Sequence, residues 1–235
     1  MAPPTPAAPP NWPPAVRYLS VPVPSPRLPA VHKAVYCAPC APQNLPNAPP
    51  KLSVKRIGDP SHPAYGQCGL FNASNKPIER GTWLRDYIGI VHGENETDPT
   101  SDYDLSLLRT VETDEEGNEK IEVVGIDATK AGNEARFVND YRGTGLPRPN
   151  AAFELRRFPL PPSSSPSAPK EGIRMAVFAG PHGIDKNAEI CVSYGRGFWE
   201  KRREEAERKA AEEAEKEAKE EPGKGKKGGK KGRTG

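Results

Sequence analysis

The segment VGIDATKAGNEARFVND, residues 124–140, decides how the chain is interpreted. It opens as an apolar strand, and its later part, residues 133–139, predicts a short helical stretch. Taken alone, its glycines suit turns and its asparagines suit helix ends. Two further segments give it weight, YGQCGLFNASNKPIERGTWLRDYIG at residues 65–89 and VFAGPHGIDKNAEICVSYGRGFW at residues 177–199.

Short runs of β-branched, aromatic and other apolar residues around these segments predict a mostly β architecture. The runs LLRTVET and KIEVVGIDA flank the turn DEEGNE and read as paired strands, whereas SDYDLSLL suits a strand or a short helix. Two later strands, AAFELRRF and IRMAVFAG, are separated by a Pro/Ser surface insertion at residues 158–172. One domain is expected over residues 51–200, which is long enough for its own core.

The two ends of the chain differ from this domain. Residues 1–50 hold 16 of the 29 prolines and no Asp or Glu, which predicts a disordered, proline-rich arm. Residues 201–221 combine strong helix formers, acid-to-base pairs four apart and only alanines on one side. They predict a solvated, charged helix, with a coiled coil as the minor alternative.

A basic tail follows at residues 222–235, where residues 224–233 carry six Lys or Arg and no acid. Such a run fits a nuclear address or nucleic-acid binding, and a disordered solubilising end is the alternative. The chain has no apolar run near the ~20 residues of a membrane helix and no secretory signal pattern. We expect a monomer without membrane attachment, in the nucleus or alternatively the cytoplasm, with its four cysteines as thiols.

No metal site is expected. Cys37 and Cys40 have the spacing of half a zinc site, but the other two cysteines are isolated and no second pair completes it. The histidines lie among loops or in the arm, without ligands at metal-binding spacing, and are expected at the surface. They are His32, His62, His92 and His182.

In their order along the chain, the three quoted segments resemble the SET-domain family of protein lysine methyltransferases. The resemblance covers residues 65–199. The matching positions are Gly69-Leu70-Phe71, Tyr87-Ile88-Gly89, Asp127-Ala128, Gly132-Asn133, Arg136-Phe137-Val138-Asn139, Ile184, Glu189 and Tyr194-Gly195. The resemblance implies a SET-domain, β-clip-like fold of short sheets, in which the block around Tyr194 threads beneath a loop in a knot-like way.

The resemblance also implies S-adenosyl-L-methionine as the cofactor. The cofactor-binding positions that it implies are Gly66, Gln67, Cys68, Gly69, Leu70, Arg136, Asn139 and Asp140. Among them, Asn139 is expected to hold the ammonium end of the cofactor and, with Asp140, to bind the adenine through the backbone. Tyr194 is implied to be catalytic, through positioning and electrostatics rather than proton abstraction. The implied lysine channel contains Tyr87, Tyr141, Phe198 and Trp199.

Four features depart from the family pattern. Gln67 stands where the family has the first glycine of a Gly-x-Gly turn, and Asp140 stands where it has a histidine. No cysteine follows Cys191, so the zinc-binding extension that closes the channel in many members is absent, and Phe198, Trp199 and the following helix take its place. No cysteine-rich block precedes the domain.

The resulting hypothesis is S-adenosylmethionine-dependent methylation of protein lysines. A histone is favoured over a non-histone protein because the tail suggests chromatin. A catalytically silent SET-fold scaffold or binding module is the first alternative. A nucleic-acid-binding protein that acts through residues 224–233 is the second.

Overall fold

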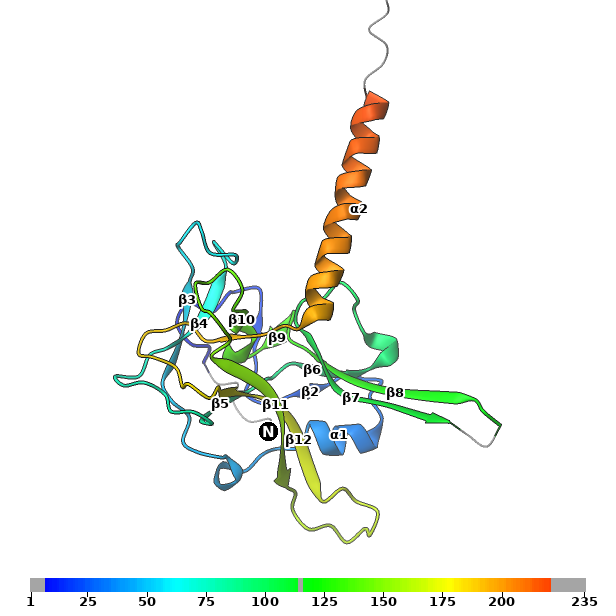
Figure 1. The fold of residues 1–235 in the computed structure, drawn as a ribbon. Coiled ribbons are helices and arrows are strands. Elements are labelled where there is room, and N and C mark those ends of the chain that lie inside the picture. Colours follow the sequence, from blue (N-terminus) through cyan, green and yellow to red (C-terminus); the bar gives the residue numbers. More distant parts are fainter. Residues whose placement is uncertain (1–6, 114–115, 221–235) are drawn as a thin grey trace, which may run out of the picture. The chain divides into compact units, whose positions relative to one another are not determined.

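The computed structural model describes residues 7–113 and 116–220. These fall in two compact units, Met1–Ser193 and Tyr194–Gly235. In its described residues the first unit consists mainly of short strands in several small sheets, together with one α-helix and short 3-10 turns (Figure 1). The predicted mostly β architecture is therefore confirmed.

The largest sheet has the strand order β2-β6-β8-β7. Its strands are β2 (Val23–Pro24), β6 (Ile90–Gly93), β8 (Glu119–Asp127) and β7 (Asp104–Thr113). β7 and β8 form an antiparallel hairpin, which confirms the predicted pairing, and the ambiguous SDYDLSLL segment enters β7 as a strand. Near Ile126 the sheet is buried, whereas the cross-strand pair Val111 and Ile121 is exposed.

A second sheet, ordered β11-β12-β5, supplies much of the core. Its strands are β11 (Ala151–Pro159), β12 (Glu171–Ala179) and β5 (Trp83–Asp86). β11 and β12 stay paired from Ala151–Ala179 to Pro159–Glu171, so the connecting Pro/Ser loop is shorter than predicted, at residues 160–170. Leu84, Ala176 and Val177 of this sheet are completely buried.

Three two-stranded sheets complete the part of the first unit that the structure describes. They are β3 (Leu52–Arg56) with β4 (Cys68–Asn72), β1 (Arg17–Tyr18) with β9 (Ala131–Gly132), and β10 (Asn139–Asp140) with β13 (Cys191–Val192). The helical elements of this unit are α1 (Ala30–Tyr36), η1 (Pro42–Asn44), η2 (Glu94–Glu96) and η3 (Glu134–Phe137). η3 fulfils the predicted helical stretch after Asn133.

The expectation of a disordered arm over residues 1–50 is wrong for residues 7–50. Short extended pieces of the arm add parallel strands to the domain, through hydrogen bonds such as Leu19 N to Gly132 O at 2.8 Å and Ser25 N to Val91 O at 2.8 Å. The arm also buries apolar side chains, namely Leu19, Leu28 and Tyr36. Its prolines preclude an independent core, but an extended backbone can dock on strand edges that another segment provides.

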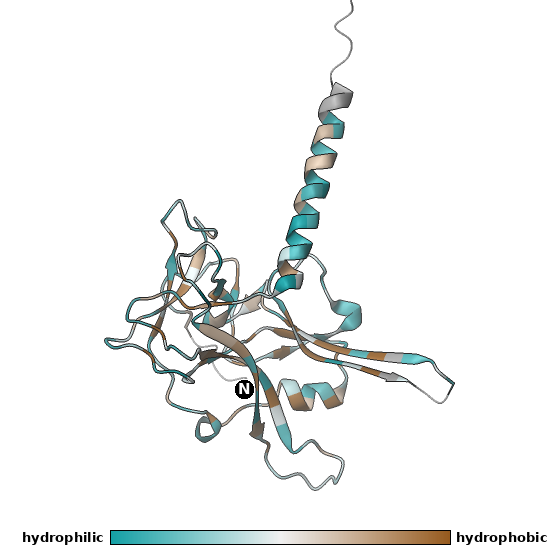
Figure 2. Cartoon of the chain, viewed as in Figure 1, coloured by the Kyte–Doolittle hydropathy of each residue, from teal (hydrophilic) through white to brown (hydrophobic). Residues whose placement is uncertain are grey.

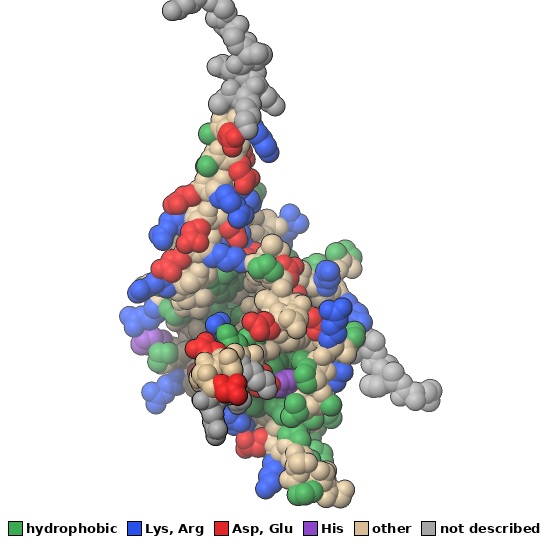
Figure 3. Space-filling model, turned by 90° about the vertical axis from the view of Figure 1, so that its right-hand side faces the viewer, with side chains coloured by type: hydrophobic (Ala, Val, Ile, Leu, Met, Phe, Trp, Pro, Cys, Tyr) green, Lys and Arg blue, Asp and Glu red, His purple; other side chains and the backbone are tan. Residues whose placement is uncertain are grey.

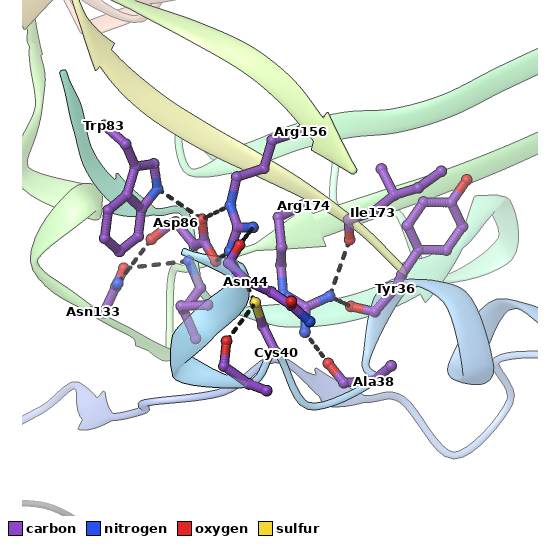
Figure 4. A network of polar contacts seen from close by, with 12 residues as sticks. Tyr36, Ala38, Cys40, Asn44, Trp83, Asp86, Asn133, Arg156, Ile173 and Arg174 are labelled. Atoms are coloured by element: carbon purple, nitrogen blue, oxygen red, sulfur yellow. Dashed lines mark hydrogen bonds and ion pairs between the residues drawn. The ribbon is translucent and has the colours of Figure 1, made fainter. Parts of the chain in front are cut away.

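Two buried arginines hold the end of the arm (Figure 4). Arg156 forms a bidentate pair with Asp86, with Nε 2.6 Å from Oδ1 and an Nη 2.5 Å from Oδ2. The same guanidinium reaches the Sγ of Cys40 at 3.5 Å. Arg174, which is 3% exposed, donates to the carbonyls of Tyr36, at 2.7 Å, and Ala38. The arm is thus tied to β11 and β12 by hydrogen bonds from two guanidinium groups.

The described part of the second unit contains the helix α2 (Arg196–Glu220). It covers residues 201–220 of the predicted charged helix and begins earlier, at Arg196, while residue 221 lies outside the described part of the chain. Hydrophilic residues dominate it, and acidic and basic side chains alternate along it (Figures 2 and 3). Ion pairs one turn apart include Arg208 with Glu212 at 3.8 Å. The predicted basic tail, residues 222–235, lies outside the described residues.

Within the described residues, neither α-helix has a stretch both long and apolar enough to cross a bilayer.

His92, in β6, is buried at 4% exposure. Its Nε2 lies 3.1 Å from Asp104 Oδ1, and its Nδ1 lies 3.0 Å from the carbonyl oxygen of Gly93. Both partners are acceptors, so the charged imidazolium satisfies both with its two N–H groups. The hydrogen bond to Asp104 is the main cause that raises the pKa of His92 above 6.5. The Gly93 carbonyl and the charge of Asp127 add to it, while burial opposes it.

The free energy of unfolding is expected to fall as the pH rises through the raised pKa of His92. A pKa that is higher in the folded state contributes stability below the ordinary value, and the contribution is lost above the folded value. Urea titrations of the wild type and of His92→Gln between pH 6 and pH 9 measure this, with a smaller pH dependence expected for the variant. Equal pH dependence in the two proteins contradicts the assignment.

Candidate functional site

Three segments that are far apart in the chain meet in the first unit. β4 continues toward residues 188–190 through hydrogen bonds from Asn72 N to Ala188 O at 3.0 Å and from Ile190 N to Leu70 O at 2.8 Å. β13 then pairs in parallel with β10, which places Asn139 opposite Cys191. The glycine turn, the Asn139 block and the segment around Glu189 therefore form one neighbourhood.

Asn139 stands at the centre of this neighbourhood. Its Nδ2 donates to Glu189 Oε1 at 2.8 Å and to the carbonyl oxygen of Cys68 at 3.3 Å. Both N–H groups of the amide are thus used, and within the described residues no hydrogen bond reaches Oδ1.

Glu189 and His62 extend the cluster. His62 Nε2 lies 3.0 Å from Glu189 Oε2, and the side chains are 10% and 12% exposed. The backbone N–H of Ala64 donates to His62 Nδ1 at 3.0 Å. Within the described residues, no Lys or Arg pairs with Glu189. The Glu189 carboxylate is therefore held by the Asn139 amide and the His62 imidazole rather than by a Lys or Arg side chain.

The prediction of surface histidines is wrong for three of the four. His32, His62 and His92 each pair with a carboxylate, at 2.9 Å, 3.0 Å and 3.1 Å respectively. The fourth, His182, is exposed beside Arg148. Each pairing partner lies on a different element, so spacing along the chain could not reveal the contacts.

Asn150 fixes the backbone that carries Glu189. Its Nδ2 donates to the Glu189 carbonyl at 2.7 Å, and its Oδ1 accepts from the N–H of Cys191 at 2.8 Å. Its own N–H donates to the carbonyl of Cys191 at 3.0 Å.

Burial raises the pKa of the Cys191 thiol to about 12, so this cysteine is a neutral packing group.

The turn before β4 has the conformational features that were expected of it. Gly66 adopts φ +78°, and the turn closes with hydrogen bonds from Gly66 N to Ile57 O and from Ile57 N to Gln67 O, at 3.0 and 2.8 Å. Gln67 is exposed, and Leu70 is completely buried. Of the predicted positions in this turn, Cys68 contacts Asn139 through its carbonyl, and Gly69 lies against the Glu189 carboxylate.

Gly69 leaves room for the Glu189 carboxylate. A Cβ at this position would lie 2.6 Å from Glu189 Oε1 and 3.0 Å from Phe71 Cε2. The obstructed atom ends a flexible side chain, so the fold can accommodate an alanine if the carboxylate moves. The Asn139 contact depends on where that carboxylate lies.

Gly69→Ala is expected to destabilise the protein by about 1.5–3 kcal/mol, because the added Cβ displaces the Glu189 carboxylate from its contacts with Asn139 and His62. Urea unfolding measures the loss. Gly58→Ala is the matched control, because a Cβ there meets nothing within 4 Å. Equal stability of the two variants would mean that the position of the Glu189 carboxylate does not matter to the fold.

The remaining motif residues pack together as support. A Cβ on Gly89 would lie 2.4 Å from the carbonyl oxygen of Asp127. Asn133 donates to the carbonyl of Asp86 at 2.8 Å and accepts from Ile88 N at 3.2 Å. Tyr87 is buried, and its hydroxyl donates to the carbonyl of Tyr103 at 2.8 Å. Each of these motif residues is therefore in close contact with the backbone of another segment, and these contacts support the fold.

Arg136 and Asp140 also make internal contacts. Arg136 Nε donates to the carbonyl of Ala128 at 2.9 Å, and its guanidinium lies 4.1 Å from the ring centroid of Tyr103. Asp140 accepts from the backbone N–H of Arg142 at 2.9 Å and pairs with its side chain at 2.9 Å. The aspartate at the family's histidine position thus closes a local turn, and these contacts give both side chains structural roles.

The aromatic residues of the predicted channel fall into both units. Tyr141 belongs to the first unit and donates its backbone N–H to Val192 O at 3.0 Å. Tyr194, Phe198 and Trp199 belong to the second. There the Tyr194 and Phe198 rings meet edge to face at 4.8 Å, and those of Phe198 and Trp199 at 5.4 Å.

No cluster of three or more metal-ligating side chains occurs among the residues that the structure describes. Cys37 is the C-cap residue that follows α1, and burial raises the pKa of its thiol to about 11. Cys40 instead contacts Arg156. The two cysteines therefore have separate packing environments.

No protein-family model matches the chain, and no curated protein matches it. Among solved structures, the chain is similar to part of one described as "Crystal structure of the Chaetomium Thermophilum polycomb repressive complex 2 (PRC2)". The match has a TM-score of 0.38 and 18% sequence identity, and it covers 63% of this chain and 16% of that chain. This chain therefore spans only a small part of the length of the chain it matches.

Proposed function

We propose that this chain transfers methyl groups from S-adenosylmethionine to lysine side chains of other proteins. The observation that carries the proposal is the meeting of the glycine turn, Asn139 and Glu189 in one neighbourhood. Those residues come from the three segments whose order resembles the SET family. Three segments can bind one cofactor only if they lie close together, as these do. We also propose that the segment around Tyr194 has the knot-like threading of that family.

The chemistry of the cluster fits the methionine end of the cofactor. Asn139 Oδ1 is an acceptor for an ammonium group, and the Glu189 carboxylate adds negative charge 2.8 Å from the Asn139 amide nitrogen. Ammonium and sulfonium groups are both positive, so this charge favours them. The backbone of Asn139 and Asp140 in β10 is the proposed contact for the adenine.

When bound, S-adenosylmethionine supplies a methyl group on a positively charged sulfur. The residues of this chain then have to align a neutral lysine amine with that methyl and exclude competing groups. Proton loss from the lysine to water suffices, so no strong base is needed. The phenol of Tyr194 positions the reacting groups, and the adjoining ring of Phe198 packs against the lysine stem.

Histones are the proposed substrate class. The argument rests on the sequence of residues 224–233, whose lysines and glycines without any acid suit contact with nucleic acid. An enzyme held near DNA meets the lysine-rich tails of histones. The same reasoning places the protein in the nucleus.

A methyl-label assay tests the proposal. Recombinant protein is incubated with labelled S-adenosylmethionine and either core histones or a whole-cell extract, and the products are resolved by gel. Label on histone bands supports the full proposal, and label only on other bands retains methyl transfer but removes the histone assignment. A folded protein that binds the cofactor without labelling any band fits the silent scaffold instead.

A further inference from the structure

We infer that His62 is a positioning residue, which acts through Glu189 and Asn139 on the ammonium group of the bound cofactor. The inference rests on the proposed function and deepens it. His62 lies outside the segments that carry the resemblance, in the loop between β3 and β4. Its role follows from the hydrogen-bond directions of the cluster.

The first step concerns the imidazole tautomer. The N–H of Ala64 donates to His62 Nδ1 at 3.0 Å, so Nδ1 acts as an acceptor. In a neutral imidazole the proton then sits on Nε2. Nε2 faces Glu189 Oε2 at 3.0 Å and therefore donates to it. One carboxylate oxygen of Glu189 is thereby occupied.

The second step concerns the Asn139 amide. Glu189 Oε1 lies 2.8 Å from Asn139 Nδ2, and a carboxylate only accepts, so the amide must turn its NH2 toward Glu189. The carbonyl of Cys68 takes the other N–H at 3.3 Å. Oδ1 consequently points away from both partners. This orientation presents an acceptor to an ammonium group, whereas the flipped amide would present a donor.

The third step is that His62 is itself held firmly. Its N–H donates to the carbonyl of Asp59 at 3.1 Å, and its carbonyl accepts from Tyr65 N at 2.9 Å. A Cβ on Gly143 would lie 2.6 Å from the ring of Pro63, so this loop packs closely on the loop that follows β10. The imidazole is therefore a fixed donor.

Two substitutions separate the donor from the local turn. His62→Asn keeps an acceptor near Ala64 but is too short to reach Glu189. His62→Gln extends an amide toward the Nε2 position and keeps the donor. His182→Asn is the control, because His182 is an exposed histidine that contacts Arg148 instead.

The test compares two ligands by calorimetric titration, S-adenosylhomocysteine and its deamino analogue. The analogue keeps the adenosine, the sulfur and the carboxylate but lacks the ammonium. The wild type is expected to prefer S-adenosylhomocysteine about tenfold or more, the scale of one hydrogen bond to a charged group. His62→Asn is expected to lose most of that preference, and His62→Gln and His182→Asn to retain it. A general loss of structure would weaken both ligands together.

Each other outcome is decisive. If the wild type binds neither ligand, the proposed function fails. If it binds both equally, the ammonium has no partner here and the inference is overturned. If the wild type shows the preference and His62→Asn keeps it in full, the proposed function stands and the role of His62 is overturned. Should His62→Asn not fold, loss of the preference in His62→Gln also overturns the role, since that variant keeps the donor.

Discussion

Asp86→Ala is expected to destabilise the protein by about 3–5 kcal/mol, the cost of leaving a buried charge without its partner. Asp86 receives both arms of the Arg156 fork and the indole N–H of Trp83 at 3.0 Å. Side-chain exposure is 12% for Asp86 and 6% for Arg156, so water cannot replace the lost carboxylate. Thermal unfolding is expected about 10 °C or more below that of the wild type.

The neighbouring Arg157 supplies the control. It pairs with Glu171 at 3.4 Å, but the two side chains are 63% and 55% exposed. Arg157→Ala is therefore expected to cost less than about 1 kcal/mol. Replacing both partners, Asp86→Leu with Arg156→Met, is expected to recover part of the loss, because the Arg156 guanidinium is then not left buried without its carboxylate. If Asp86→Ala costs no more than Arg157→Ala, the pair does not hold β5 and β11 together.

Tyr194→Phe is expected to lower methyl-transfer turnover about 100-fold, the scale of losing one positioned polar group in a reaction centre. The change removes only the hydroxyl, so the ring contact with Phe198 remains. Single-turnover measurements with a labelled methyl donor separate this effect from cofactor affinity, which is expected to stay near the wild-type value.

The control for Tyr194→Phe is a tyrosine whose hydroxyl has no role in the proposed reaction. Tyr65→Phe serves, since Tyr65 is 57% exposed on the loop before β4. Turnover of Tyr194→Phe close to that of Tyr65→Phe would remove the Tyr194 hydroxyl from the mechanism.

The strands were predictable because their patterns are local. The alternation in β7 and β8 and the turn between them specify a hairpin without reference to the rest of the chain. The Pro/Ser loop was found for the same reason, and only its ends moved, since β11 and β12 stay paired as far as Pro159 and Glu171. The helical turn after Asn133 also depends on neighbouring residues alone.

The arm and the histidine could not be predicted because their contacts are distant. The proline-rich composition correctly indicates that residues 7–50 lack a core of their own. It does not show that these residues can form hydrogen bonds to the strand edges at Gly132 and Val91. Glu189 is 127 residues from His62, and neither residue has a local pattern that points to the other. Asn139 and Glu189 both stand in the segments that resemble the SET family, but those segments do not reveal internal contacts such as the one from Arg136 to the Ala128 carbonyl.

The central claim is that the cluster around Asn139 binds S-adenosylmethionine, and equilibrium binding of the labelled cofactor to the wild type and to Asn139→Ala tests it most directly. We expect saturable binding at one site by the wild type, and an affinity about tenfold or more lower in the variant. Bound cofactor should also raise the unfolding temperature of the wild type as its concentration exceeds Kd. A folded wild-type protein with no saturable binding, or an Asn139→Ala variant that binds as tightly, would contradict the account.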